Sequence, residues 1–296
     1  MQRMMKTLLA STIAIAASIG HSHADEIVVG GLNYTEHLLL TSATTQYLEH
    51  HGYEVDQREG LGTSVLRQAQ ENGQVDLYWE YTGNSVILFN DQPQPENAEE
   101  TYRIAKELDA EKGLVWLDAT DTNNTYALAM REDDAEVRGI ASMSDLADAL
   151  NAGEELVLAS NAEFYARDDG LRPLQEAYGF EFPRDRVRRM DSGLTYNALR
   201  DENADVALVF ATDGRNGAFN FRVLEDDQSF FPVYALAPVI REDTLDQYPE
   251  LEELLNAMAA TLNDDLLIEL NSRVDVDGEE IGRVAASYLT EHGLID

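Results

Sequence analysis

The sequence predicts an α/β protein of two lobes, each with a three-layer αβα arrangement, in which two crossover strands join the lobes. Short runs of strand character alternate with helical patterns along the chain, which is typical of mainly parallel sheets covered by helices. A chain of 296 residues is large for one compact core and comfortable for two. The tetrapeptide Tyr-Ala-Leu-Ala occurs twice, at 126–129 and at 234–237, and Arg-Glu-Asp follows shortly after each copy.

The repeated tetrapeptide marks the two places where we expect the chain to cross between the lobes. A solenoid would need more copies at a shorter period. Each copy opens with a tyrosine, so both tyrosines are expected to face the cleft between the lobes. Residues 25–127 and 234–296 are then expected to form the first lobe, and residues 128–233 the second.

In the predicted first lobe, strands and helices alternate. Apolar residues at helical spacing and a threonine that can cap the helix predict a long helix from Thr35 to about Gly52. Further helices are expected after Gly62 and from about Pro95 to Lys112. The strands are expected at 26–29, 55–59, 76–81 and 114–117.

The predicted second lobe has the same alternation. Ser144 is expected to cap a helix. The strands are expected at 156–159, 187–190 and 206–210, further helices at 170–178 and 196–201, and, after the second crossing, only helices, at 248–262, 264–270 and 278–292.

The first 24 residues have the pattern of a secretory signal peptide. Arg3 and Lys6 form a basic end, an apolar run follows from 7 to 19, and Ser22-His23-Ala24 fits a cleavage site with small residues. The apolar run is too short to remain in a bilayer as an anchor. We therefore expect a periplasmic protein that begins at Asp25.

The composition restricts the partners and the chemistry. The sequence has no cysteine, which excludes disulfides, thiolate metal sites, a cysteine nucleophile and a lipid-modified cysteine. There are 56 acidic and 21 basic residues, so the net charge is −35, and such a charge repels nucleic acid and anionic lipid. Adaptation to high external salt explains this charge better than steering of a cationic substrate, because salt screens steering.

No motif indicates a catalytic, cofactor or metal site. The glycines at 60 and 62 lack the third glycine of the dinucleotide fingerprint and the lysine of a P-loop. The acidic run at 274–280 lacks the ligand spacing of a calcium loop. The histidines form no metal-binding pair, and no Gly-x-Ser-x-Gly elbow is present. We therefore expect a protein that is not an enzyme and needs no cofactor or metal.

Four aromatic residues lie where a ligand pocket is expected. Tyr81 and Phe210 end predicted strands, and Tyr126 and Tyr234 open the two crossing runs. Ligands of α/β sheets bind outside the carboxyl ends of the strands, so these rings from two lobes are expected to share one pocket. Aromatic faces carry negative potential and suit quaternary ammonium, at about 0.5–2 kcal/mol per contact.

Arg167 allows two interpretations. Its guanidinium could hold a ligand carboxylate in a bidentate fork. It could equally pair with Asp168 or Asp169, which follow it in the sequence.

Ordered motifs over essentially the whole mature chain carry a resemblance to a known family. The motifs are Gly30-Gly-Leu-Asn-Tyr-Thr-Glu36, Glu80-Tyr-Thr-Gly83, Asn123-Asn-Thr-Tyr-Ala-Leu-Ala129, Phe164-x-x-Arg167-x-Asp-Gly170, Gly193-Leu-Thr-Tyr-x-Ala-Leu199, Ala211-Thr-Asp-Gly214, Val223-Leu-Glu-Asp-Asp227, Phe230-Phe-Pro-x-Tyr234 and Tyr248-Pro-Glu-Leu-Glu252. In these segments the chain resembles the substrate-binding proteins of ABC importers for glycine betaine, choline and related compatible solutes.

This resemblance implies the periplasmic-binding-protein fold of type II and a set of ligand-binding residues. By position, the implied residues are Tyr81, Tyr126 and Tyr234 of an aromatic cage, Phe210 where relatives have a further tyrosine, Asn84 and Asn124 of the pocket wall, and Arg167 as the carboxylate-binding arginine.

Two positions depart from the family's pattern. Relatives often have a lysine that helps to bind carboxylate where this chain has Leu32, and a glutamine where it has His37. We still expect His37 in the pocket. The weaker grip on a carboxylate makes choline, or another onium solute, a competitor of glycine betaine.

The resemblance also implies partners. The closed protein, expected to be a monomer, would dock on a membrane permease that a cytoplasmic ATPase drives, and no nucleic acid would be involved. Two alternatives stay open. One is a periplasmic enzyme that hydrolyses a choline-type ester, for which no nucleophile–base pair is identified. The other is a solute receptor for signalling, which the sequence does not separate from transport.

Overall fold

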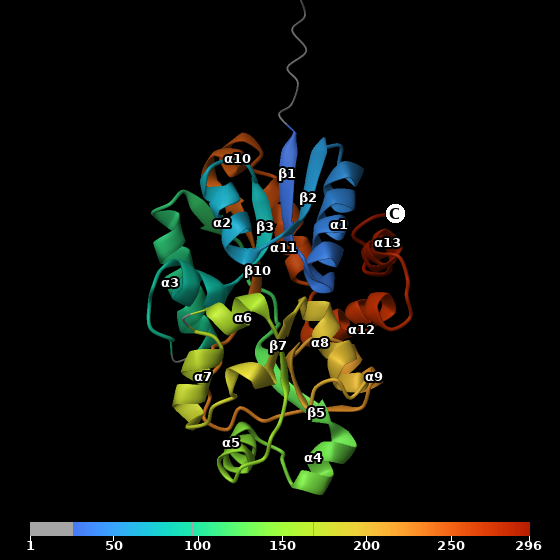
Figure 1. Cartoon of the computed structure of the whole chain (residues 1–296). Coiled ribbons are helices and arrows are strands. Elements are labelled where there is room, and N and C mark those ends of the chain that lie inside the picture. Colours follow the sequence, from blue (N-terminus) through green and yellow to red (C-terminus); the bar gives the residue numbers. More distant parts are fainter. Residues whose placement is uncertain (1–25, 96, 168) are drawn as a thin grey trace, which may run out of the picture.

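The computed structural model describes residues 26–95, 97–167 and 169–296, and these form two α/β lobes, one above the other in Figure 1. The first lobe is built on a five-stranded sheet of order β2-β1-β3-β10-β4, and the second on a five-stranded sheet of order β7-β6-β8-β5-β9. The predicted fold class is thus confirmed. The predicted signal peptide lies outside the described residues.

The first lobe contains both ends of the described chain. Its strands are β1 (Ile27–Leu32), β2 (Val55–Leu61), β3 (Leu77–Tyr81), β4 (Leu114–Trp116) and β10 (Leu236–Arg241). Its helices are α1 (Thr35–His50), α2 (Thr63–Glu71), the π-helix η1 (Asn84–Phe89), α3 (Ala98–Ala110), α10 (Glu242–Gln247), α11 (Leu251–Ala259), α12 (Asp264–Asp275) and α13 (Ile281–Glu291). Helices α1 and α11 share a buried apolar core with one face of the sheet, and α2, η1 and α3 with the other, which makes three layers.

In the second lobe, the alternation of small and large side chains in the first crossing run corresponds to the two faces of the sheet. Its strands are β5 (Tyr126–Arg131), β6 (Leu158–Asn161), β7 (Val187–Met190), β8 (Val206–Phe210) and β9 (Phe221–Val223). Its helices are α4 (Glu132–Arg138), α5 (Met143–Asn151), α6 (Ala162–Ala166), α7 (Leu171–Tyr178), the 3₁₀ helix η2 (Arg184–Arg186), α8 (Ser192–Arg200) and α9 (Arg215–Ala218). Leu128 and Met130 pack into the core under α5 and α7, whereas Ala127 and Ala129 face α8 on the other side, because successive side chains of a strand point to opposite faces.

The chain crosses between the lobes at 117–125 and at 224–235, as the strand assignments place them. The first crossing leads into β5, which is antiparallel to β8 and β9, and the second into β10, which is antiparallel to β3 and β4. The crossings are hydrogen-bonded to each other: the backbone N–H of Asn124 donates to the carbonyl of Tyr234 (3.2 Å), and the N–H of Tyr234 donates to Asn123 Oδ1 (2.8 Å). Each repeated tetrapeptide therefore lies at the start of the antiparallel strand of the sheet that it enters.

Several boundaries differ from the expected ones. Ser142, not Ser144, caps α5, because Ser142 forms a capping box with Asp145, whereas three residues after Ser144 stands Ala147, which has no acceptor for a reciprocal bond. Strand β5 begins at Tyr126, just before the boundary expected after residue 127. Within the described residues, no helix is long and apolar enough to cross a bilayer.

Candidate functional site

A pocket between the two lobes collects the four aromatic residues that the sequence analysis selected. Tyr81, Tyr126, Phe210 and Tyr234 all line it. The ring centroid of Tyr126 lies 5.2 Å from that of Phe210 and 6.0 Å from that of Tyr234, and the Tyr81 and Tyr234 centroids are 6.5 Å apart. We call this group the aromatic cage. The space enclosed is about 30 Å³, room for about two water molecules, so a trimethylammonium group would require the walls to separate.

The local structure positions these rings. Tyr126 and Phe210 are directly opposite each other on β5 and β8, so their rings meet at the end of the second sheet. Tyr81 ends β3 and lies opposite Leu236 of β10. The turn after β3 passes so close to Tyr234 that a Cβ on Gly83 would lie 2.8 Å from two ring atoms. Only glycine allows this approach of the backbone to the ring.

Tyr34, which the sequence analysis did not select, adds a fifth ring. It lies just before α1 in the first lobe and stacks on Phe210 of the second lobe, with centroids 5.2 Å apart and planes 15° apart. The strand before it was expected to end at residue 29, but β1 runs to Leu32. With the correct strand end, Tyr34 lies just after the end of a strand, close to the kind of position that Tyr81 and Phe210 occupy.

Arg167 lies beside the cage with its guanidinium fully engaged. Its Cζ is 5.5 Å from the Tyr126 ring centroid. Nε and Nη2 donate to the two carboxylate oxygens of Asp169 (2.7 and 2.6 Å), and Nη1 and Nη2 both donate to Asn84 Oδ1 (3.2 and 3.1 Å). The remaining N–H of Nη1 faces Glu163 at 3.4 Å. The pairing with Asp169 is one of the two expected alternatives, and it uses the fork that a ligand carboxylate would need.

Glu36, also not selected, is a buried carboxylate beneath the cage. Its Oε1 accepts hydrogen bonds from the Tyr81 hydroxyl (2.5 Å) and Asn124 Nδ2 (2.9 Å). Its Oε2 accepts from the Thr212 hydroxyl (2.6 Å) and Asn271 Nδ2 (3.1 Å). Thr212 belongs to the second lobe, so this carboxylate joins the lobes. Burial raises the pKa of Glu36, and the four hydrogen bonds act in the opposite direction.

A second buried carboxylate, Glu80, lies on the other side of Tyr81. It accepts hydrogen bonds from the Tyr78 hydroxyl (2.5 Å), the backbone N–H of Tyr81 (2.7 Å) and Asn84 Nδ2 (3.1 Å). Burial raises its pKa as well. The predicted residues Asn84 and Asn124 both line the pocket, and each links the cage to one of these acidic groups. The cage therefore has acceptors and acidic groups, rather than cations, behind it.

His37 lies behind the cage rather than in its wall. Its ring centroid is 5.0 Å from Tyr34 and 5.4 Å from Tyr81, but among the described residues it is not part of the pocket lining. The side chain is fully buried, and burial lowers its pKa to about 3, so the ring is neutral. Nδ1 accepts a long hydrogen bond (3.4 Å) from the N–H of Leu32. His37 is therefore not in the pocket wall, where it was expected. Its side chain packs against the rings of Tyr34 and Tyr81 from behind.

Comparisons with known proteins identify the family. A family model described as the substrate binding domain of ABC-type glycine betaine transport systems matches residues 25–291. A glycine-betaine-binding protein of Pseudomonas aeruginosa is 42% identical over 302 residues, which cover 100% of this chain and 97% of the relative. The glycine betaine-binding protein YehZ of Escherichia coli is 35% identical, over 98% of each chain.

Comparison with solved structures identifies the same family. A structure described as a glycine betaine/carnitine/choline ABC transporter superposes with a TM-score of 0.74 at 27% identity, covering 92% of this chain and 100% of that one. The neighbours share the type II periplasmic-binding-protein fold. Among the described residues, no group of His, Asp and Glu side chains is arranged to hold a metal ion. The chain belongs to the family of substrate-binding domains of ABC-type glycine betaine transport systems.

Proposed function

We propose that this protein binds a quaternary-ammonium compatible solute, such as glycine betaine or choline, between its lobes and delivers it to the permease of an ABC importer. The observation that carries the proposal is that Tyr81, Tyr126, Phe210 and Tyr234, from both lobes, line one pocket. Aromatic faces attract a cation that has no N–H to donate. The carboxylates of Glu36 and Glu80 behind the rings favour a positive ligand further.

The proposed mechanism is binding without chemistry. A solute that touches both lobes favours the closed arrangement, because only that arrangement supplies both sets of contacts. The hydrogen bonds of Thr212 with Glu36 and of Arg167 with Asn84 are contacts of this arrangement. The crossings at 117–125 and 224–235 are the hinge. We propose that the two bodies that move are the parts on either side of this hinge: residues up to 116 with residues 236–296, and residues 126–223.

The proposed cellular location and partners are those that the family resemblance implies. Residues 1–24 would be removed during export to the periplasm, where the closed protein, as a monomer, would dock on the permease and the ATPase would act from the cytoplasm. The acidic composition indicates adaptation to high external salt, and a compatible-solute ligand fits the same habitat.

Calorimetric titration tests the proposal. Choline and glycine betaine are titrated into the wild-type protein and into the Tyr126→Ala, Tyr126→Phe and Tyr53→Ala variants, at a salt concentration that keeps all of them folded. We expect saturable binding that Tyr126→Ala weakens at least tenfold, since one cation–π contact and its shielding from water are lost. Tyr126→Phe, which keeps the ring, and Tyr53→Ala, outside the pocket, should retain the affinity. An absence of binding heat with every onium solute would overturn the ligand class.

A further inference from the structure

We infer that a side pocket next to the aromatic cage makes the protein prefer onium solutes whose tail ends in a hydrogen-bond donor, such as the hydroxyl of choline, over those whose tail ends in a carboxylate. The inference rests on the proposed function and specifies its ligand.

The side pocket has a free volume of about 140 Å³, larger than the space within the cage. It adjoins the cage, because the stacked rings of Tyr34 and Phe210 line both spaces. The shared residues are Asn33, Tyr34, Asn124, Ser192 and Phe210. In the inferred pose, the ammonium group of the solute lies in the cage and its tail lies in the adjoining side pocket.

Buried oxygen atoms without a partner line this side pocket. Among the described atoms, Oδ1 of Asn124 and Oδ1 of Asn271 accept no hydrogen bond, and both residues are in the wall. Oδ2 of Asp275 accepts no hydrogen bond either, but it lies 3.4 Å from Nη2 of Arg215 in an ion pair. Asn124 and Asn271 are 7% and 3% exposed, so bulk water does not serve them freely. Buried acceptors of this kind favour a ligand that brings a donor.

The hydrogen bonds fix the orientation of both amides. Nδ2 of Asn124 and Nδ2 of Asn271 both donate to the carboxylate of Glu36 (2.9 and 3.1 Å). A carboxylate can only accept while it is ionised, so a flipped amide would turn oxygen toward oxygen. The amide oxygens therefore point away from Glu36 and remain available to a ligand.

The charges of the side pocket also disfavour a carboxylate tail. Among the described residues that line the side pocket, Glu36, Asp213 and Asp275 are acidic and Arg215 is the single cation. Arg215 is already held by Asp213, with Nε–Oδ1 at 2.9 Å and Nη2–Oδ2 at 2.5 Å, and lies over the Tyr196 ring at 4.0 Å. A ligand carboxylate would meet like charge and unpaired acceptors, which is how a site rejects one of two similar ligands.

The other cation near the cage does not reverse this preference. The N–H groups of Arg167 are engaged by Asp169, Asn84 and Glu163. A carboxylate tail directed to that side would have to displace Asp169. A hydroxyl tail directed to the side pocket displaces no existing pair.

The test compares three ligands that share a quaternary ammonium group: choline, glycine betaine and tetramethylammonium, which has no tail. Calorimetry at high salt is done with the wild-type protein, with Asp275→Asn, and with Asp277→Asn, a control that removes the same charge at an exposed position outside the pocket. In the wild type, choline should bind at least fivefold more tightly than glycine betaine. Asp275→Asn should reduce this ratio at least threefold, because the new amide offers a donor and carries no charge. Tetramethylammonium, which has no tail, measures any loss of affinity that all three ligands share because the contact of Asp275 with Arg215 between the lobes is altered. Asp277→Asn should keep the wild-type ratio.

Each contrary result has one meaning. If glycine betaine binds the wild type as tightly as choline, or if Asp275→Asn leaves the ratio unchanged while all three ligands bind, the inference is wrong and the proposed function stands. If none of the three ligands binds the wild-type protein, the proposed function fails, and the inference fails with it.

Discussion

Glu36 is the residue on which the cage and the closure of the lobes both depend. Its two oxygens receive four donors, from Tyr81, Asn124, Thr212 and Asn271. Two oxygens that each accept two hydrogen bonds use most of the acceptor capacity of an ionised carboxylate. The residue therefore holds a ring of the cage, a crossing segment and the second lobe together.

We predict that Glu36→Gln lowers both stability and affinity for an onium solute. The new amide has one oxygen and one NH₂ group. The hydroxyl beside the NH₂ group can turn to accept, but the amide NH₂ of Asn124 or Asn271 on that side would face another donor. We expect a loss of about 2 kcal/mol in the free energy of unfolding and at least a tenfold loss of affinity for choline. Urea unfolding and calorimetry measure these quantities. Glu49→Gln, exposed on the same helix, should change stability by less than about 0.5 kcal/mol; equal effects of the two variants would contradict this role of Glu36.

His37 leads to a prediction about pH. Burial lowers its pKa to about 3 in the folded protein, against about 6.5 in the unfolded chain. Between these values the unfolded chain binds a proton that the folded protein does not bind, so the contribution of His37 is present above about pH 6.5 and is lost as the pH falls. The slope is up to about 1.4 kcal/mol per pH unit.

Urea unfolding between about pH 7 and pH 5 should show this slope in the wild type. The His37→Gln variant should lose less stability over the same range. All other titrating groups are common to the two proteins, so the difference reports on His37. Parallel curves would show that the ring becomes protonated in the folded state.

The aromatic part of the site could be predicted from the sequence, because strand ends and repeated crossing runs are visible in it. In the polar part, Asn84, Asn124 and Arg167 were predicted through the family resemblance, whereas the hydrogen-bond network around Glu36 was not. Thr212 and Asn271 are far from Glu36 in the chain, and Thr212, which belongs to the second lobe, meets it only when the lobes close. One buried glutamate cannot be distinguished by composition among 56 acidic residues. Tyr34 was missed for a simpler reason, since the end of β1 was placed too early.

At the scale of elements, a buried ion pair fixes the helices on one face of the first sheet. Asp109 of α3 accepts hydrogen bonds from Nη1 and Nη2 of Arg67 in α2 (2.8 and 2.5 Å). Ser85, Asn90 and Trp116 also donate to it. Burial alone would raise the pKa of Asp109, but these bonds, with Arg67 the strongest, hold it below its usual value. The pair thus ties α2, η1, α3 and β4 together.

Arg67→Met should be strongly destabilising, because it leaves a buried carboxylate without its cation. We expect a loss of about 3–5 kcal/mol in the free energy of unfolding, measured by urea denaturation. The matched control is Arg103→Met, in which an exposed i,i+4 pair with Glu107 is lost at a cost of less than about 1 kcal/mol. A loss below about 1 kcal/mol for Arg67→Met would show that the ion pair is dispensable.

Long helices were predictable and helices of one or two turns were not. The helix from Thr35 was predicted to within a few residues, since it is long enough for its apolar spacing to be recognised. Helices α6 (Ala162–Ala166) and α9 (Arg215–Ala218) contain too few turns to show a period. The π-helix η1 (Asn84–Phe89) lies where the sequence analysis expects no helix. Its backbone carries Asn84 into the pocket, and π-helical turns are frequent at functional sites.

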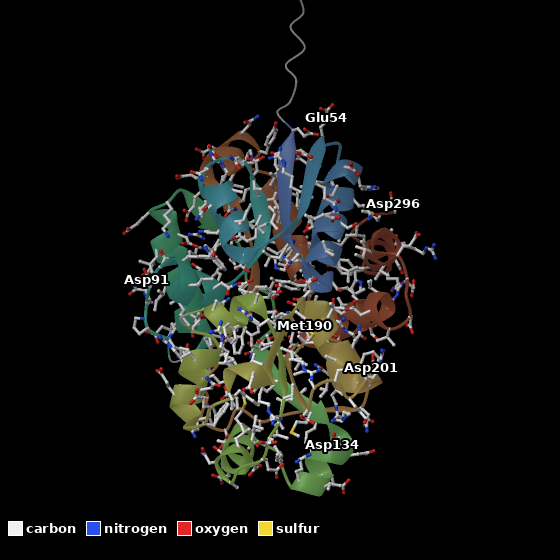
Figure 2. All side chains as sticks on the ribbon, viewed as in Figure 1. Glu54, Asp91, Asp134, Met190, Asp201 and Asp296 are labelled. Atoms are coloured by element: carbon white, nitrogen blue, oxygen red, sulfur yellow. The ribbon has the colours of Figure 1, made fainter. Side chains whose placement is uncertain are left out.

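At the scale of the whole molecule, the acidic surface and the site are separate features. Figure 2 shows acidic side chains such as Glu54, Asp91, Asp201 and Asp296 at the outer edges of both lobes. The carboxylates that matter for the pocket are few and buried. Salt will therefore act mainly on repulsion at the surface, and cation recognition depends on groups that solvent reaches poorly.

The two lobes meet through a small number of specific contacts. Tyr34 stacks on Phe210, Thr212 donates to Glu36, and Arg215 lies 3.4 Å from Asp275. In each case one partner comes from each lobe. Because the cage itself is divided between the lobes, opening of the cleft separates its walls. Ligand capture and closure are then a single event.

The most direct test of this account is an NMR titration of the protein with choline labelled with ¹³C in its N-methyl groups. Protons held over aromatic faces are shielded by the ring currents. We predict that the bound methyl resonance moves clearly upfield of its free position, and that the movement becomes smaller in Tyr126→Ala. A bound methyl resonance at the free position, or one that Tyr126→Ala does not affect, would show that the ammonium group does not lie among these rings.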